Sequence, residues 1–356
     1  MARLTRAEMQ ECNRAKVLAA ARDEFAERGF REAKIDAIAE RAELTRGAVY
    51  SNFPGKRALY FAVLADLAER APGAPHPERG RSVRDALGAF ARAWVARLPV
   101  SERDRLGRDV IPEILADERV RRPFTQLMKL DALLLALALE HLEPPETPAG
   151  APPGRLVRLA RTVLTTLHGA SQLAAAAPGF VEPFDVVSAC EQLAGLAFND
   201  FWAPPAAVPP VQPVGRPWAP PREIDMARAE FARPGHDGVV AVLGLHRLAA
   251  VEQAVRAGAE VTAVLVTSDP GEFAPLARLA VAEFFGCLRQ AVPPSAWPRV
   301  QIVCDSSGAF SAAAGVLAVS DETEAAVRVE GGHVVARAEG QGACHAVAAG
   351  LHTNSR

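Results

Sequence analysis

Polar side chains suited to nucleic-acid binding are concentrated in one short stretch, between Leu44 and Tyr60. Arg46 carries a planar fork of donors that fits the edge of a guanine, and Gly47 beside it lets a helix approach a groove closely. Four more residues carry groups that can bind phosphate oxygens: Thr45, Tyr50, Asn52 and Lys56. The stretch therefore predicts a helix that reads base edges and holds the DNA backbone.

Two short helices must position these side chains. Apolar residues at helical spacing predict a first helix ending near Ala42: Ile35, Ile38, Ala39 and Ala42. A turn of about three residues follows, and Thr45 can cap the next helix with its hydroxyl. In that helix Ala48, Val49 and Phe53 face the packing side, and Pro54-Gly55 ends it. The arrangement is a helix-turn-helix, whose second helix enters the major groove.

The same stretch strongly resembles the signature of TetR-family transcriptional regulators. The matching positions are Leu44, Thr45, Gly47, Tyr50, Phe53, Lys56 and Leu59. The resemblance implies an all-α region of two parts, a helix-turn-helix followed by a helical domain with a small-molecule pocket and a dimer interface. It also implies a homodimer that binds a double-stranded DNA operator and, as a repressor, is released by an unknown small-molecule effector.

Two positions depart from the family pattern. Glu43 lies in the turn where the family usually has glycine, and a positive φ at a non-glycine residue costs about 1 kcal/mol. Ala33-Lys34 replaces the Ser or Thr that usually caps the first helix of the motif. We expect Lys34 to contact the DNA backbone instead.

The chain is divided into four predicted segments: 1–70 the helix-turn-helix, 80–202 the helical domain, 203–234 a Pro-rich linker and 235–356 an α/β domain. In the helical domain a break is expected at Pro123. By the family resemblance Trp94, Phe124 and His168 are candidates to line the ligand pocket, although such residues are more often plain core. The linker is expected to be an extended spacer without a packed core, so a chain ending near Ala203 should still fold.

After Gly235 strands alternate with helices, which predicts an α/β layer with a parallel portion. The order of elements and the segment Asp305–Val316 are similar to the thioredoxin-like fold in its peroxiredoxin-type form. Catalysis in that fold needs a thiolate after the first strand, where this chain has Leu245–Leu248 without cysteine. We therefore expect no enzyme, no catalytic residues, no cofactor and no metal.

A thiol-based function is the alternative. Cys344 is placed in the first turn of the last helix, and a helix N-terminus lowers the pKa of a thiol. Cys304 and Cys287 are further candidates. In this interpretation the chain is a redox sensor or a thioredoxin-like redox enzyme with an accessory DNA-binding domain.

Composition narrows the class of protein. A net charge of −2 over 356 residues argues against a general coat for nucleic acid, but a local basic patch suffices for an operator reader. The five cysteines show no C-x-x-C spacing, so neither a zinc site nor a disulfide framework is expected. The longest aliphatic block, Leu133–Leu139, is too short to span a bilayer. The sequence predicts a cytoplasmic protein that does not bind membranes.

Overall fold

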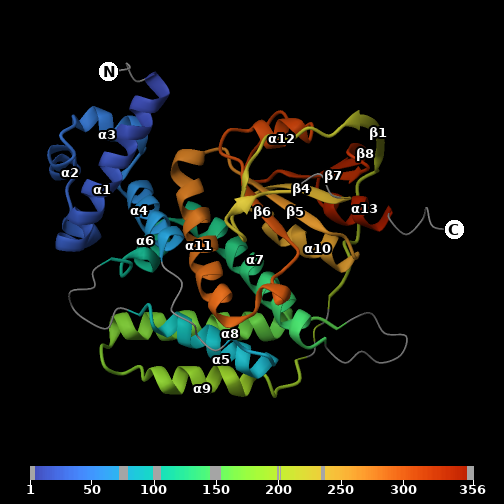
Figure 1. The fold of residues 1–356 in the computed structure, drawn as a ribbon, viewed down its shortest axis with the longest axis horizontal. Coiled ribbons are helices and arrows are strands. Elements are labelled where there is room, and N and C mark those ends of the chain that lie inside the picture. Colours follow the sequence, from blue (N-terminus) through green and yellow to red (C-terminus); the bar gives the residue numbers. More distant parts are fainter. Residues whose placement is uncertain are drawn as a thin grey trace.

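A computed structural model describes residues 5–350 except 72–78, 99–105, 145–153, 199, 201 and 234–236. Helices fill one part of the molecule and a mixed sheet with its own helices fills the other (Figure 1). We divided the chain into a helix-turn-helix unit, a helical unit and an α/β unit. Whether each of these units folds by itself stays a prediction.

Four helices form the N-terminal region: α1 (Arg6–Glu32), α2 (Ile35–Arg41), α3 (Arg46–Asn52) and α4 (Lys56–Arg70). Thr5 and Glu8 form a capping box at the start of α1. Near its end Gly29 has φ 71° and kinks the helix. The buried side chains that hold α2 and α3 against α1 include Phe25, Ile38, Val49 and Phe53. The predicted helix-turn-helix is therefore confirmed in its element order.

Five helices form the next layer: α5 (Val83–Val95), α6 (Val110–Ala116), α7 (Glu118–Leu142), α8 (Val157–Ala176) and α9 (Pro183–Leu193). Our prediction of a break at Pro123 is wrong, because this residue lies inside α7. Asp117 caps α7 by accepting from the Arg119 amide at 2.9 Å. Pro123 lies close to the start of α7. Proline has no amide hydrogen to donate, so the hydrogen bond that is lost is one of the first in the helix.

The third region contains a six-stranded sheet in the order β1-β8-β7-β4-β5-β6. Its strands are β1 (Gln212–Pro217), β4 (Gly238–Gly244), β5 (Val261–Val266), β6 (Gln301–Cys304), β7 (Glu324–Glu330) and β8 (His333–Glu339). Strands β4, β5 and β6 run parallel, whereas β7 and β8 are antiparallel to their neighbours. The predicted α/β layer and the hairpin at Gly331-Gly332 are confirmed.

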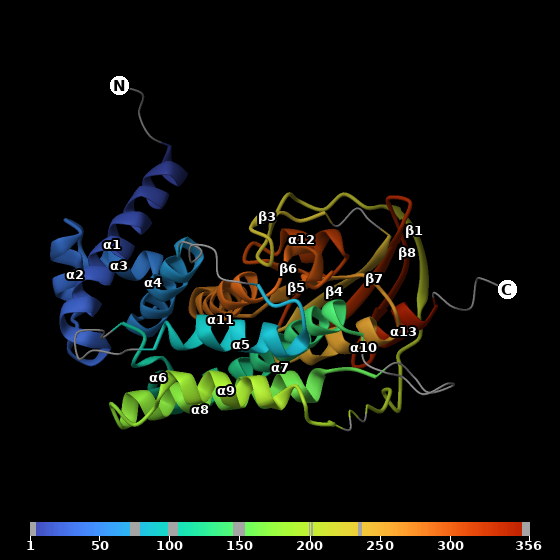
Figure 2. The ribbon, with the colours of Figure 1, turned by 60° about the horizontal axis from the view of Figure 1, so that its bottom comes forward.

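Helices cover both faces of this sheet (Figure 2). They are α10 (Val251–Arg256), α11 (Pro270–Ala291), α12 (Ala309–Ala313) and α13 (Ala343–Ala349), with short 3-10 turns η1 (Leu248–Ala250) and η2 (Pro294–Ala296). Alternate residues of β4 enter different cores: Val239 and Ala241 join one cluster, while Val240 and Val242 join the other. Burial on both faces explains why this strand reads as one continuous apolar run.

The Pro-rich segment is not the extended spacer that we expected. It contributes β1, which pairs antiparallel with β8, and a small hairpin of β2 (Ile224–Asp225) and β3 (Glu230–Phe231). Trp218 is buried against Phe310, their ring centroids 5.9 Å apart. Proline cannot donate to a strand ladder, and Pro213 and Pro217 are tolerated because β1 lies at the edge of the sheet.

Helix α11 joins the α/β region to the helical regions. It packs along α4 and also against α5 and α7 (Figures 1 and 2). Phe284 of α11 contacts Phe90 of α5, with ring centroids 5.8 Å apart, and one apolar cluster extends from Val17 to Ala348. A chain ending near Ala203 would leave the surfaces under α11 exposed to water, so we no longer expect it to fold.

None of the helices in the described part of the chain is both long and apolar enough to cross a bilayer.

Candidate nucleic-acid interface

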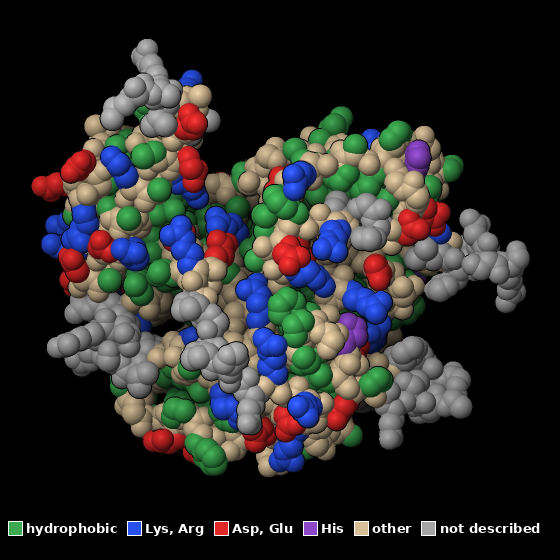
Figure 3. Space-filling view, in the orientation of Figure 1, with side chains coloured by type: hydrophobic (Ala, Val, Ile, Leu, Met, Phe, Trp, Pro, Cys, Tyr) green, Lys and Arg blue, Asp and Glu red, His purple; other side chains and the backbone are tan. Residues whose placement is uncertain are grey.

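Helix α3 presents the predicted reading face to solvent. The Thr45 hydroxyl accepts from the Ala48 amide at 3.2 Å and caps the helix, as expected. Thr45, Arg46, Gly47 and Tyr50 are exposed, whereas Val49 is buried. On the surface of this region basic side chains alternate with acidic ones (Figure 3). The positive electrostatic potential is therefore confined to small patches and does not cover the whole face.

Arg46 makes only weak, exposed contacts within the protein. Its Nη1 lies 3.4 Å from Asp36 Oδ1, and its guanidinium carbon is 5.5 Å from the centre of the Tyr50 ring. The hydrogen bond to Tyr50 and the charge of Asp36 raise the pKa of Arg46, so the group stays charged. Both ionic partners are more than half exposed. Such surface contacts are weak, and a guanine edge can replace them.

Lys56 and Asn52 bond to the protein itself. The Lys56 Nζ donates to the carbonyl oxygens of Arg31 at 3.2 Å and Ala33 at 3.1 Å, and lies 4.6 Å from the Phe30 ring centre. The Asn52 amide donates to the Ala48 carbonyl at 2.8 Å. Lys56 thus ties the start of α4 to the end of α1. The phosphate contacts that we expected for these two residues stay predictions.

The two departures from the family pattern have visible consequences. Glu43 has φ 55°, the left-handed conformation that the sequence predicted for a position where glycine is usual. Lys34 is the N-cap of α2 and makes no side-chain cap bond. Its backbone amide instead donates to Glu24 Oε1 at 3.4 Å, from a carboxylate buried in α1. The Lys34 side chain is exposed and free to meet a phosphate.

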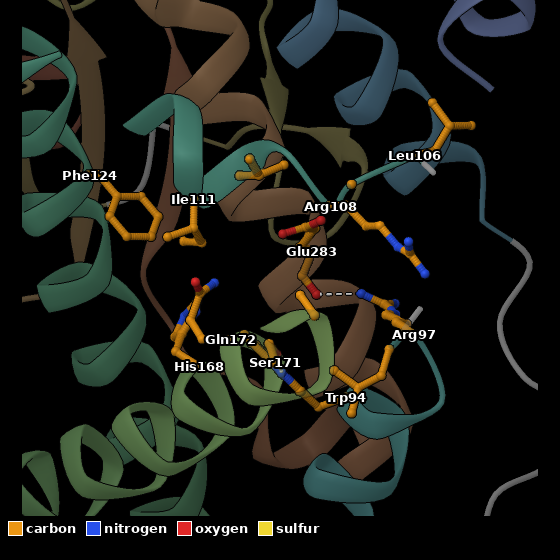
Figure 4. A pocket seen from close by; sticks show the side chains of 14 residues that line it. Trp94, Arg97, Leu106, Arg108, Ile111, Phe124, His168, Ser171, Gln172 and Glu283 are labelled. Atoms are coloured by element: carbon orange, nitrogen blue, oxygen red, sulfur yellow. Dashed lines mark hydrogen bonds between the residues drawn. The ribbon is translucent and has the colours of Figure 1, made fainter. Parts of the chain in front are cut away.

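Trp94, Phe124 and His168 line one cavity of about 170 Å³ between the helices (Figure 4). The His168 ring makes edge contacts with Trp94 and Phe124, at centroid distances of 4.8 and 6.1 Å. Trp94 Nε1 donates to Ser171 Oγ at 2.9 Å. Burial lowers the pKa of His168 to about 4, so the ring is neutral at physiological pH. Ligand binding by these residues stays a prediction.

The sequence did not indicate that α11 also contributes to this cavity. Glu283 lies in its wall, between Phe124 and His168 on one side and Arg97 and Arg108 on the other in the view of Figure 4. Arg97 of the segment after α5 donates from Nη1 to the Glu283 carbonyl oxygen at 2.8 Å. No sequence pattern near residues 94–172 predicts a contact with Glu283, which lies much further along the chain.

Comparison with known proteins identifies the N-terminal segment. Residues 17–63 match the family described as "Bacterial regulatory proteins, tetR family". These residues form a TetR-family helix-turn-helix domain. They include α2, α3 and the start of α4, which carry the reading face.

Two curated relatives each match 65 residues of the chain. The "HTH-type transcriptional regulator SrpR" of Pseudomonas putida is 46% identical over 65 residues, 18% of this chain and 30% of that protein. The "Uncharacterized HTH-type transcriptional regulator TtgW", from a strain of the same species, is also 46% identical over 65 residues, 18% of this chain and 48% of that protein. The chain thus matches less than half of the length of either relative.

Solved structures of regulators give a weaker likeness. A TetR transcriptional regulator from Rhodococcus sp. RHA1 aligns with 52% of this chain and 95% of its own, at 22% identity and a TM-score of 0.36. NalD, the secondary repressor of the MexAB-OprM multidrug efflux pump in Pseudomonas aeruginosa, aligns with 52% and 96%, at 20% identity and a TM-score of 0.32. TM-scores this low do not establish a common fold for the whole chains.

Arg57 connects the TetR-family domain to the rest of the protein, a role that the sequence did not indicate. It follows Lys56 at the start of α4, and its Nη2 lies 2.9 Å from Asp117 Oδ2, at the N-cap of α7. The same guanidinium bonds Glu272 in the first turn of α11. Glu272 is 215 positions away along the chain, so only the fold brings the three groups together.

Apart from the exposed Cys12, the cysteines lack the properties that a reactive thiol needs. Burial raises the pKa of Cys287 and of Cys304 to about 12, and that of Cys190 to about 11. Cys344 begins the last helix as predicted, but burial and then the charge of Glu324 raise its pKa well above the ordinary value. The raised pKa therefore does not fit the redox alternative, in which the helix N-terminus lowers the pKa of Cys344. Among the described residues no cluster of His, Cys, Asp and Glu could hold a metal ion.

Proposed function

We propose that the protein is a transcriptional regulator that binds a double-stranded DNA operator through α3. The observation that carries the proposal is the exposed face of Thr45, Arg46, Gly47 and Tyr50 on a TetR-family domain. In this face Arg46 contacts a base edge in the major groove, and Thr45, Tyr50 and Lys34 hold the backbone. A second copy of the chain would place another α3 about 34 Å away, one helical turn along the duplex.

Exposed apolar side chains near α8 and α9 support the homodimer. Phe180 is 70% exposed and Phe184 78% exposed, and Leu173 lies nearby at the end of α8. These helices form the side of the molecule opposite the sheet (Figure 2). Water contact is unfavourable for large apolar groups, and a second copy packed over them would remove it.

Release by a small effector is supported by the path from the cavity to the reading head. Val110 and Ile111 of α6 line the cavity, and Asp117 follows at the junction of α6 and α7. Asp117 in turn bonds Arg57 of α4. A ligand that favours one position of α6 therefore also favours one position of α4, and shifts the population of DNA-competent dimers.

For the α/β region we propose a thioredoxin-like domain that supports the regulator and does not catalyse a reaction. The order β8-β7-β4-β5, with β4 and β5 parallel and β7 and β8 antiparallel, supports the assignment. At the end of β4, where the thiolate would lie, α7 covers the chain. Its Gln126 accepts from the Ala249 amide at 3.0 Å, and its Arg122 lies 2.6 Å from Glu322. This cover and the raised thiol pKa values favour a regulator over a redox enzyme.

The proposed function is tested by selection of DNA by the full chain from a random duplex library, followed by fluorescence anisotropy on the enriched sequence. We expect enrichment of a two-fold symmetric site with half-sites one helical turn apart, and two chains per duplex by analytical ultracentrifugation. Binding without enrichment of any sequence, even at low salt, would contradict an operator-specific regulator.

A further inference from the structure

We propose that Glu283 of α11 makes the cavity a site for a small cationic aromatic molecule, a single ring that carries an ammonium or amidinium group. The inference rests on the proposed function, since it names the class of effector that would occupy the cavity. It also gives the α/β region a direct part in ligand recognition, because α11 belongs to that region.

The size and walls of the cavity set the apolar part of the ligand. Its volume of about 170 Å³ is close to that of a cavity that holds one benzene molecule, about 150 Å³. Trp94 and Phe124 present aromatic rings to it, and Ile111 adds an aliphatic side chain (Figure 4). Aromatic faces also attract cations, so these walls suit a ring with a positive charge.

Glu283 provides the acceptor for that charge. Its carboxylate reaches the cavity, and among the described residues it makes no hydrogen bond or ion pair (Figure 4). The two arginines of the lining are already engaged: Arg97 bonds the backbone carbonyl of Glu283, and Arg108 has a partner as well. Among the described residues the carboxylate thus forms no hydrogen bond or ion pair, although the nearby charge of Arg97 acts on it.

A second acid, Asp131 of α7, lies within reach of the charge of Glu283. Asp131 is 3% exposed, and its Oδ1 has no hydrogen-bond partner. Burial raises the pKa of Asp131 well above the ordinary value, and the charge of Glu283 raises it further. Desolvation by the surrounding protein raises the pKa of Glu283, and the charge of Arg97 opposes this shift, while the side chain itself is exposed. A bound cation would stabilise the charged form of both groups.

The other ionisable groups of the lining already make contacts of their own. His168 is neutral, Arg97 binds the backbone carbonyl of Glu283, and Arg108 has an interaction within the chain. An anionic ring would place a negative charge beside the Glu283 carboxylate, which is unfavourable. A neutral ring would fill the cavity but leave the carboxylate without a partner.

The experiment compares three probes of one shape on the full chain by isothermal titration calorimetry: benzamidine, benzamide and benzoate. We expect benzamidine to bind about tenfold more tightly than either of the others, as for a hydrogen bond to a charged group. Its affinity should increase from acidic to neutral pH, as Glu283 loses its proton. Tighter binding of benzoate, equal binding of all three, or no binding of benzamidine would overturn the proposal.

Glu283→Gln tests the residue itself. The variant keeps the backbone carbonyl that Arg97 binds, and should lose about tenfold in benzamidine affinity and its pH dependence while benzamide binding stays the same. Glu118→Gln, on the exposed start of α7, is the matched control and should bind like the wild type. Circular dichroism shows whether each variant is folded, and Glu283→Asp, which keeps the charge, should retain the preference for benzamidine if Glu283→Gln is unstable.

DNA binding separates this proposal from the proposed function. If the chain binds its selected duplex but shows no preference for benzamidine, the ligand class is wrong and the regulator stands. If it prefers benzamidine through Glu283 but selects no duplex, the ligand site stands and the regulator is wrong.

Discussion

Arg57 of α4 donates two hydrogen bonds to the same carboxylate oxygen of Glu272 in α11, from Nε at 2.8 Å and from Nη2 at 2.6 Å. Glu283 follows eleven residues later in the same helix, close to three turns, and so lies on nearly the same side about 16 Å away. One rigid helix therefore contacts the start of α4 at one end and the cavity at the other. Any displacement of α11 by a ligand at Glu283 would also move the Glu272 carboxylate that Arg57 binds.

We predict measurable energetic coupling between Arg57 and Glu272. A double-mutant cycle with Arg57→Gln and Glu272→Gln, read by urea denaturation, should give about 1 kcal/mol, because both side chains are largely buried and the bonds are charge-assisted. The Arg299–Glu260 pair, exposed at 75% and 58%, is the matched control and should show no coupling. Equal coupling for the two pairs would mean that the α4–α11 contact has no special role.

Lys56 and Lys34 should behave differently when each is replaced by alanine. Lys56→Ala removes two hydrogen bonds to backbone carbonyls, so it should lower the free energy of unfolding by about 1–2 kcal/mol. Lys34→Ala removes an exposed cation and should leave stability unchanged. In DNA titrations at several salt concentrations, Lys34→Ala should weaken binding to all sequences and reduce the salt slope by about one. Unchanged stability of Lys56→Ala would contradict its structural role.

Replacement of Glu43 by glycine should stabilise the protein. The φ of 55° costs a non-glycine residue about 1–2 kcal/mol, and part of this gain is lost through the greater freedom of glycine in the unfolded chain. We expect a net increase of about 0.5–1 kcal/mol in the free energy of unfolding. Glu43→Ala removes the same charge but keeps the strained φ, and should not be stabilised. If alanine and glycine have the same effect, the charge rather than the backbone determines stability at this turn.

The thiols should react slowly in the native protein. With pKa values of about 12, Cys287 and Cys304 are almost entirely protonated near neutral pH. The thiolate fraction of Cys344 is smaller than that of an ordinary cysteine. N-ethylmaleimide should therefore modify the exposed Cys12 first, as mass spectrometry of digests can show. In a Cys12→Ser variant, DNA binding should be unaffected by the reagent. Loss of binding together with modification of a buried cysteine would support the redox-sensor interpretation.

Local features of the sequence predicted the reading head well. The cap at Thr45, the break at Pro54-Gly55 and the positive φ of Glu43 all depend on residues within a few positions of one another. Hydrophobic periodicity likewise predicted β4, β5 and the long helix α11, since strands buried on both faces read as continuous apolar runs.

Contacts between distant residues could not be predicted in this way. The composition of the Pro-rich segment predicts a spacer. Part of it forms strand β1 because it pairs with the edge of β8, a contact between distant parts of the chain. Lys56 reads as a phosphate ligand, but the carbonyls at the end of α1 lie within its reach. The helical spacing of α11 shows that it is amphipathic without showing that α4 is its partner. Arg57 and Glu283 were missed for the same reason.

The reading role of Arg46 is the central claim, and base specificity tests it most directly. The measurement compares wild type with Arg46→Ala on the selected duplex and on duplexes in which each base pair is changed singly. Because a bidentate arginine–guanine contact provides about 1–3 kcal/mol of discrimination, the variant should lose that amount on the selected duplex. Its preference should relax at one base pair in each half-site and remain at all others. An equal loss of affinity on every duplex, with all preferences intact, would show that Arg46 holds the backbone and would contradict the account.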